Sequence, residues 1–183
     1  MRIVGGAHRG KRLIAPKGLA TRPTTDRTRE SLFNILSNKV ELDGLRVLDL
    51  FAGTGALGLE AISRGAGFSL FIEMASPARA AIRQNIEALQ VVGNTKIFRR
   101  DAIKLGAIGT MKPFDLVFAD PPYGKGLGEK AAASLLEGGW LAKEAVFILE
   151  EASENFPASL KGFQLMDQRK FGETTIGLFE SLQ

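Results

Sequence analysis

The chain has 183 residues, of which 45% are hydrophobic and 24% are charged, and this composition fits a globular protein with a sizeable buried core. It contains no cysteine and only one histidine, which excludes disulfides, thiolate metal sites and cysteine nucleophiles and disfavours histidine-based zinc or triad chemistry. The first residues carry charge and glycine where a signal peptide needs an apolar segment. We therefore expect a cytoplasmic protein without a metal ion or a membrane partner.

Positive charge is concentrated at the N-terminus. Residues 1–40 carry a net charge of +7, whereas residues 41–183 carry −3. Lys and Arg side chains that neutralise phosphates release counterions, so a basic segment beside an acidic body favours a polyanionic partner. The sequence thus predicts a basic extension over residues 1–40 that binds a polyanion, and a second domain over residues 41–183.

The extension is expected to form a hairpin and a helix. Two short extended stretches, 2–4 and 11–14, are separated by glycines, and Asp26 is expected to cap a helix that runs to about Lys39. From residue 45 onward, strands and helices alternate.

Further strands are predicted at 47–51, 68–73, 96–98, 115–119 and 145–149, with helices after the first, second and fourth of them. Ser76 and Pro77 are typical of the cap and first position of the second of these helices. The last two stretches, 163–167 and 175–180, predict an antiparallel hairpin at the sheet edge. The pattern predicts an α/β fold with a mostly parallel, seven-stranded sheet.

A glycine-rich turn follows the first strand of this sheet. Residues 49–58 read DLFAGTGALG, which places a G-x-G-x-x-G pattern between a strand and a helix. Gly53 and Gly55 let the backbone approach a ligand, and Glu73 follows the second strand, where a carboxylate accepts from ribose hydroxyls. Both NAD and S-adenosylmethionine fit this pattern. Asp49 favours the second, because a carboxylate suits its ammonium group and repels a pyrophosphate.

A second motif, Asp120-Pro121-Pro122-Tyr123, follows the strand predicted at 115–119. Two consecutive prolines stiffen the loop. We expect the Asp120 carboxylate and the Pro121 carbonyl to accept hydrogen bonds from an exocyclic amine, and Tyr123 to stack on the base that carries it. The motif therefore predicts a clamp that binds an amine.

Together the two motifs resemble those of S-adenosylmethionine-dependent amino-methyltransferases. More narrowly, residues 22–36 (RPTTDRTRESLFNIL), the opening RIVGG at 2–6 and the closing FGETT at 171–175 are similar to the bacterial 16S rRNA guanine-N2 methyltransferases of the RsmD family. The resemblance covers nearly the whole chain. It implies a Rossmann-like methyltransferase domain that methylates the exocyclic N2 amine of a specific guanine in 16S rRNA, as a monomer acting on a small-subunit assembly intermediate.

The resemblance also implies which residues form the site. Met74 would pack on the adenine ring, which the Asp101 side chain and the Ala102 backbone would also contact. The expected cofactor-binding residues are Asp49, Phe51, Gly53, Gly55, Glu73, Met74, Asp101 and Ala102, and the expected catalytic residues are Asp120, Pro121 and Tyr123. Together with the charge pattern, the resemblance predicts RNA contacts by Arg9, Lys11, Arg12, Arg22, Thr24, Arg27 and Arg29.

Three other functions remain open at this point. Methylation of DNA at adenine N6 or cytosine N4 keeps the same chemistry, although 183 residues leave little room for a target-recognition module. A nicotinamide-dependent oxidoreductase gives the motif at 120–123 no role. A non-catalytic RNA-binding module does not need carboxylates after successive strands.

Overall fold

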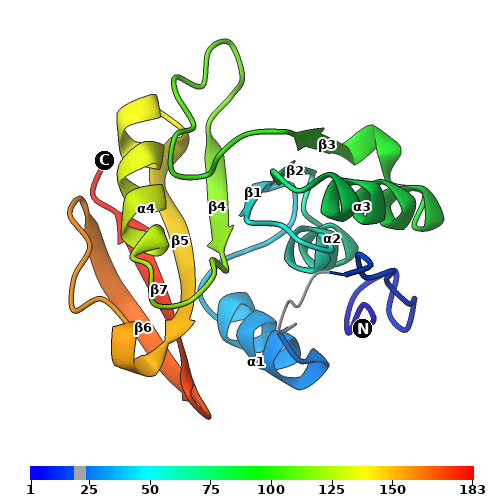
Figure 1. Ribbon diagram of the computed structural model, residues 1–183, viewed down its shortest axis with the longest axis horizontal. Helices are drawn as coiled ribbons and strands as arrows, with labels where there is room; N and C mark the ends of the chain where they lie inside the picture. Colours follow the sequence, from blue (N-terminus) through cyan, green and yellow to red (C-terminus); the bar gives the residue numbers. More distant parts are fainter. Residues whose placement is uncertain (19–23) are drawn as a thin grey trace. The chain divides into compact units, whose positions relative to one another are not determined.

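The computed structural model describes residues 1–18 and 24–183 and divides into two compact units, Met1–Arg99 and Arg100–Gln183. We refer to them as the N-terminal unit and the C-terminal unit and describe each by itself. Figure 1 shows the elements of both in the colours of the sequence. None of the helices in the two described ranges combines the length and the hydrophobicity that crossing a membrane requires.

Helices and strands alternate along the N-terminal unit (Figure 1). In chain order they are α1 (Asp26–Ser37), β1 (Arg46–Leu50), α2 (Ala56–Ser63), β2 (Phe68–Ile72), α3 (Ser76–Ala88), a short 3-10 helix η1 (Val92–Asn94) and β3 (Thr95–Phe98). β1 pairs with β2, and β2 with β3, in parallel. Leu50 and Ile72 are paired at the carboxyl ends of β1 and β2, so the loops after these two strands begin side by side.

The C-terminal unit contains the longest strands. Its elements are β4 (Phe114–Ala119), α4 (Leu127–Gly138), β5 (Leu141–Ala152), a 3-10 helix η2 (Ser153–Asn155), β6 (Phe163–Phe171) and β7 (Thr174–Ser181). β5 pairs in parallel with β4 on one side and antiparallel with β7 on the other. Because both edges of β5 are paired and residues 145–151 are buried, the end of this strand is a rigid support for neighbouring loops.

The seven strands are ordered β3-β2-β1-β4-β5-β7-β6 in one sheet. β7 runs antiparallel to both of its neighbours, β5 and β6, and β6 forms the predicted C-terminal hairpin with it. The predicted fold class, a mostly parallel seven-stranded sheet with an antiparallel hairpin at its edge, is confirmed.

The predicted helix caps are each displaced by one residue. Thr25, not Asp26, caps α1, because its extended backbone lets the hydroxyl accept from the Thr28 N–H at 3.1 Å. Asp26 instead lies in the first turn of the helix, where an acidic side chain is favoured. Ala75, not Ser76, precedes α3, and its N–H donates to the Glu73 carboxylate at 2.8 Å.

Residues 1–14 pack onto the N-terminal unit. The predicted hairpin is present as a single bridge between Arg2 and Arg12, with the Ile3 N–H donating to the Lys11 carbonyl at 2.9 Å. Ile3 and Leu13 are buried in the same apolar cluster as Leu59 of α2. These residues therefore belong to the compact N-terminal unit, and the predicted boundary at residue 40 is not where the two compact units divide.

A buried carboxylate holds this segment to α2. The Glu60 side chain is fully buried, and its two oxygens accept from the Val4 N–H at 2.9 Å and the Gly5 N–H at 2.8 Å. The Arg64 Nε donates to the same carboxylate at 2.8 Å. Since a buried charge is costly without partners, Glu60 is stabilised by the segment that it holds.

Arg29 has a different position from the one expected for an RNA contact. Its side chain is fully buried, its Nη2 donates to Asp26 at 2.9 Å and to the Arg2 carbonyl, and its Nε lies 3.7 Å from a Glu60 oxygen. A guanidinium enclosed in this way has no surface to offer a phosphate. This burial does not favour the predicted RNA contact of Arg29, whose hydrogen bond to the Arg2 carbonyl joins α1 to the N-terminal segment.

Replacing Glu60 with alanine should destabilise the protein by about 3–5 kcal/mol, because Arg29 and Arg64 would lose the charge that compensates their burial. The measurement is urea-induced unfolding at neutral pH. Glu41→Ala, at an exposed position, is the control and should change the free energy of unfolding by less than about 0.5 kcal/mol. A Glu60→Ala protein as stable as the control would show that this carboxylate does not hold the segment.

Candidate active site

The glycine-rich turn between β1 and α2 is built on left-handed backbone. Phe51, Gly53 and Gly55 have φ values of 56°, 58° and 77°. A left-handed conformation costs a non-glycine residue about 1–2 kcal/mol, so Phe51 is held there by its surroundings. The turn is closed by the Gly55 N–H, which donates to the Ala52 carbonyl at 2.7 Å. Strain of this kind is typical of loops that approach a ligand.

The third glycine of the pattern has a packing role. A Cβ atom at Gly58 would lie 2.5 Å from the Phe71 ring and 2.6 Å from the Ser69 hydroxyl, which is closer than real contacts allow. Only glycine therefore lets α2 pack this tightly on β2. This close packing fixes the start of α2, and with it the direction in which its first N–H groups point.

Glu73 connects the glycine-rich turn with the start of α3. One of its oxygens accepts from the Gly53 N–H at 2.9 Å, and the other accepts from the Ala75 N–H at 2.8 Å. Each carboxylate oxygen has two lone pairs, so both retain capacity to accept from a ligand hydroxyl. The structure thus brings together Glu73 and Gly53, two of the predicted cofactor-binding residues.

Asp49 lies below the turn rather than on its surface. Only 1% of the residue is exposed, and its Oδ2 accepts from the Gly58 N–H at 2.9 Å. Burial raises the pKa of Asp49 to about 8; the Gly58 hydrogen bond opposes this shift and the negative charge of Glu73 adds to it. Asp49 is placed to hold the turn, and its position does not favour the expected direct contact with an ammonium group.

Met74 is half exposed, with 51% of its surface accessible, although it directly follows a buried strand. Arg79 donates to the carbonyl oxygens of Glu73 and Met74, at 3.3 Å and 2.5 Å, and so holds the backbone at this point. An exposed methionine beside Glu73 is available to pack on an aromatic ligand. This position agrees with a binding role better than with a core role.

The C-terminal unit holds the remaining predicted cofactor-binding residues. The Asp101 Oδ1 accepts from the Ile103 N–H at 3.1 Å, which closes a local turn, and Ala102 is buried. The Arg100 Nη1 donates to the Leu105 carbonyl at 3.1 Å. The backbone around Asp101 is therefore fixed by its own hydrogen bonds.

The predicted clamp directly follows β4. Asp120 and Tyr123 are partly exposed, whereas Pro121 is buried. The Tyr123 hydroxyl donates to the Glu150 carboxylate at 2.7 Å, and the Gly124 N–H donates to Glu151 at 3.0 Å. The end of β5 thus anchors the loop that carries the clamp.

Glu60, Glu150 and Glu151 are not among the residues predicted from the sequence. The signal that singles out Glu73, a carboxylate at the end of a predicted strand, also applies to Glu150 and Glu151. Glu60 has no such signal, because its backbone partners are 55 and 56 residues away in the chain.

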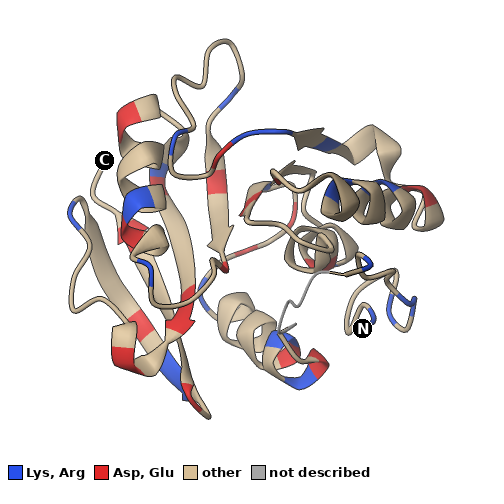
Figure 2. Ribbon diagram, viewed as in Figure 1, with Lys and Arg blue, Asp and Glu red and all other residues tan. Residues whose placement is uncertain are grey.

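Most of the residues predicted to contact RNA lie on the surface. Arg9, Lys11, Arg12 and Arg27 are exposed, and Figure 2 shows lysine and arginine along the N-terminal segment and at the start of α1. Thr24 is partly exposed, and its carbonyl accepts from Arg29 at 3.3 Å. Arg22 lies outside the described residues.

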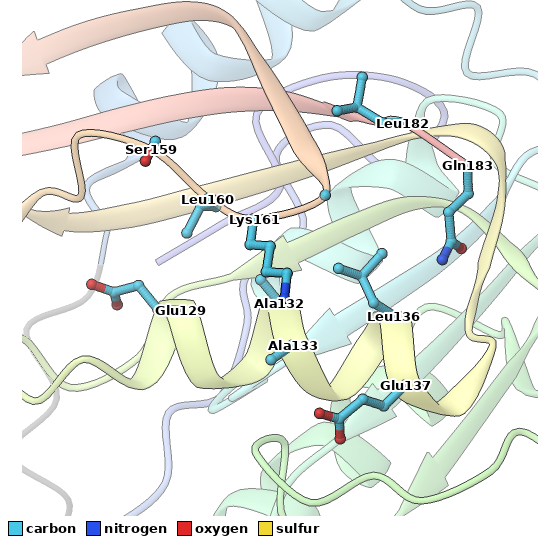
Figure 3. A pocket seen from close by; sticks show the side chains of 11 residues that line it. Glu129, Ala132, Ala133, Leu136, Glu137, Ser159, Leu160, Lys161, Leu182 and Gln183 are labelled. Atoms are coloured by element: carbon cyan, nitrogen blue, oxygen red, sulfur yellow. The ribbon is translucent and has the colours of Figure 1, made fainter.

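A hollow of about 490 Å³ in the C-terminal unit is separate from these residues. Figure 3 shows it between α4, the loop at 159–162 and the last two residues of the chain. None of its lining residues belongs to the predicted site. Elsewhere in the described ranges, no group of three or more His, Asp or Glu side chains is arranged to hold a metal ion.

A solved structure from Escherichia coli, "Putative methyltransferase yhhF", is similar to this one with a TM-score of 0.84 and 36% identity, covering 99% of this chain and 97% of that chain. The fold is therefore that of the Rossmann-like methyltransferases. The family model "Conserved hypothetical protein 95" matches residues 1–180. The chain belongs to this family, and the predicted membership of the RsmD family is confirmed.

Two curated relatives extend this comparison. "Ribosomal RNA small subunit methyltransferase D" of Escherichia coli (strain K12) is 39% identical over 182 residues, which cover 98% of this chain and 89% of that protein. "Putative rRNA methyltransferase YlbH" of Bacillus subtilis (strain 168) is 32% identical over 184 residues, covering 98% of each. The similarity thus spans both compact units.

Asp49→Asn should flatten the dependence of stability on pH. The pKa of Asp49 is higher in the folded protein than in the unfolded chain, so the folded state binds more protons between about pH 4 and 8 and its stability falls as pH rises. One such group contributes a slope of up to about 1.4 kcal/mol per pH unit. Urea unfolding at pH 5 to 8 measures it, with the exposed Asp43→Asn as control. Parallel curves for wild type and Asp49→Asn would contradict this result.

Proposed function

We propose that this protein transfers a methyl group from S-adenosylmethionine to the exocyclic N2 amine of a guanine in 16S rRNA. The name of the 39% identical Escherichia coli relative supports methylation of small-subunit rRNA. The choice of the guanine N2 amine rests on the sequence motifs that resemble the RsmD family. The observation that carries the chemistry is the Asp120-Pro121-Pro122-Tyr123 loop, anchored at the end of β5 by Glu150 and Glu151.

The residues of the N-terminal unit fit S-adenosylmethionine better than a dinucleotide. Glu73 retains lone pairs that can accept from the ribose hydroxyls. Met74 has an exposed apolar side chain that can pack on the adenine. We assign contacts with the adenine to Asp101 and Ala102 as well. The Glu73 carboxylate, which accepts from the Gly53 N–H of the turn, favours a cationic ligand over a pyrophosphate. When bound, S-adenosylmethionine supplies an electrophilic methyl group.

The clamp would act on the amine. A guanine amine is a poor nucleophile because its lone pair is delocalised into the ring. Hydrogen bonds to the Asp120 carboxylate and the Pro121 carbonyl favour a pyramidal nitrogen, whose lone pair is then directed at the methyl group. Tyr123 offers its ring for stacking on a base that has left the helical stack.

The N-terminal unit would contribute the RNA contacts. Arg9, Lys11, Arg12 and Arg27 are exposed and carry positive charge, and Glu60 of α2 fixes the segment that carries the first three. We assign Thr24 and Arg22 to the same role from the sequence alone. The substrate is proposed to be a small-subunit assembly intermediate, on which the protein acts as a monomer in the cytoplasm.

Asp120→Ala should abolish methyl transfer and leave cofactor binding intact, because this carboxylate acts on the amine. Loss of one preorganised hydrogen-bond partner costs a factor of about 10²–10³ in rate. Asp120→Asn keeps an acceptor oxygen and should retain measurable activity. Transfer of labelled methyl groups to small-subunit particles measures the rate, and the rise in melting temperature with S-adenosylhomocysteine measures cofactor binding.

A near-normal rate in Asp120→Ala would contradict the proposed clamp. Stabilisation of the wild type by NADH and not by S-adenosylhomocysteine would contradict the cofactor assignment. The two results are independent, since the first concerns the C-terminal unit and the second concerns ligand choice.

Reversing the charges of Arg9, Lys11 and Arg12 to glutamate should weaken RNA binding and reduce its salt dependence. Each lost phosphate contact lowers the slope of log affinity against log salt concentration by about 0.7–0.9. The control reverses the exposed Lys130, Lys143 and Lys161. A slope unchanged in the first triple variant, or lowered equally in the control, would place the RNA surface elsewhere.

A further inference from the structure

Tyr123 is the only tyrosine of the chain, and its hydroxyl has a specific buried partner. The hydroxyl donates to Glu150 at 2.7 Å. Glu150 belongs to β5 and is only 7% exposed. A buried tyrosine hydroxyl needs only one acceptor, and a backbone carbonyl would be sufficient. Burying a carboxylate as this acceptor costs more free energy than burying a neutral one, so the fold alone does not require Glu150 here.

The next residue along β5 fixes the backbone of the same loop. Glu151 is 2% exposed, and its Oε1 accepts from the Gly124 N–H at 3.0 Å and from the Ala152 N–H at 2.8 Å. Gly124 has a φ of 74°, so the chain turns sharply directly after Tyr123. Glu150 therefore holds the ring and Glu151 holds the backbone at consecutive points of one loop.

The support for both carboxylates is rigid. Glu150 pairs with Ile176 and Glu151 pairs with Thr175 of β7, while Leu149 of β5 pairs with Ala119, the last residue of β4. β5 is thus hydrogen-bonded to the strand that delivers the clamp and to the strand on its other side. A carboxylate on such a strand has little freedom to follow a moving ring.

We propose that Glu150 is a positioning residue for methyl transfer, which fixes the plane of the Tyr123 ring so that its face is ready to stack on the target base. Glu151 assists by fixing the backbone of the loop. This proposal rests on the function proposed above, because it assigns the stacking face to the same base whose amine is methylated. The free-energy cost of orienting the ring is met on folding and not on substrate binding.

The groups around the hydroxyl determine how Tyr123 ionises. Burial raises the pKa of Tyr123 above its ordinary value, and the negative charges of Glu150 and Asp120 raise it further. A hydrogen bond with the Thr174 side chain acts in the opposite direction. Since the chain has no other tyrosine, the ultraviolet absorbance of tyrosinate during an alkaline titration reports Tyr123 alone.

The first test is this titration on the intact protein without ligands, made by rapid mixing so that tyrosinate absorbance is read before alkaline unfolding exposes the ring. Glu150→Ala should lower the pH at which tyrosinate absorbance appears, because a negative neighbour is removed. Glu154→Gln is the matched control, since Glu154 lies exposed in η2 directly after β5, and it should titrate like the wild type. Identical titrations of Glu150→Ala and the wild type would overturn the role of Glu150.

The second test is methyl transfer to small-subunit particles. Tyr123→Phe keeps the ring and removes its hydroxyl, so it should lose roughly 10- to 100-fold in kcat, and Glu150→Ala should lose as much. The double variant should lose no more than either single variant, because both remove one interaction. Glu150→Gln keeps an acceptor and should recover part of the rate, while stabilisation by S-adenosylhomocysteine stays unchanged in all four.

Additive losses in the double variant, or full activity in Glu150→Ala, would overturn the positioning role. The two proposals fail separately. A wild-type protein that methylates no small-subunit RNA contradicts the proposed function, whereas an unchanged tyrosine titration in Glu150→Ala contradicts the Tyr123–Glu150 interaction itself.

Discussion

Carboxylates that accept from backbone N–H groups hold the loops on which the proposed chemistry depends. A loop that approaches a ligand leaves the helical and strand hydrogen-bond patterns, and an N–H group that is buried without an acceptor costs about 1–3 kcal/mol. In this protein the acceptor is repeatedly an Asp or Glu near the end of a strand. The pairs are Asp49 with Gly58, Glu73 with Gly53 and Ala75, Asp101 with Ile103, and Glu151 with Gly124.

This arrangement has an electrostatic consequence for ligand choice. In the N-terminal unit, the Glu73 carboxylate that accepts from the glycine-rich turn also places negative charge beside it, and this charge adds to the rise that burial causes in the pKa of Asp49. A cationic cofactor is favoured in such a field, while a pyrophosphate is disfavoured. In our proposal, the charge of Glu73 therefore both holds the backbone and favours S-adenosylmethionine.

Hydrogen bonds from backbone N–H groups to a carboxylate also link the basic segment, residues 1–14, to the rest of the N-terminal unit. Glu60 accepts from the backbone N–H groups of residues 4 and 5, as Glu73 accepts from those of residues 53 and 75. The exposed cationic side chains of residues 9–12 therefore extend from a segment whose backbone is fixed. The sequence predicts this segment as an extension because its interaction with α2 is non-local and leaves no periodic signal. The segment and the glycine-rich turn share one compact unit.

Local patterns predicted most of the fold, because alternating strands and helices, glycine turns and the C-terminal hairpin depend on residues close in sequence. The positive charge of Arg29 predicts an exposed side chain, but this side chain is fully buried. It lies at the i, i+3, i+4, i+7 spacing with Leu32, Phe33 and Leu36, and these four are the buried residues of α1. Helical spacing thus indicated that Arg29 is buried. It did not indicate the buried partner of Arg29, because Glu60 is 31 residues away in the chain.

In the proposed function, the amine clamp of this protein positions guanine N2 of small-subunit rRNA for methylation. The most direct measurement is mass spectrometry of nucleosides after incubating the protein and isotopically labelled S-adenosylmethionine with small-subunit particles, naked rRNA or duplex DNA. We expect labelled N2-methylguanosine from the ribosomal RNA and no labelled base from DNA. Labelled N6-methyladenine or N4-methylcytosine from DNA, or no labelled nucleoside from any of the three, would contradict it.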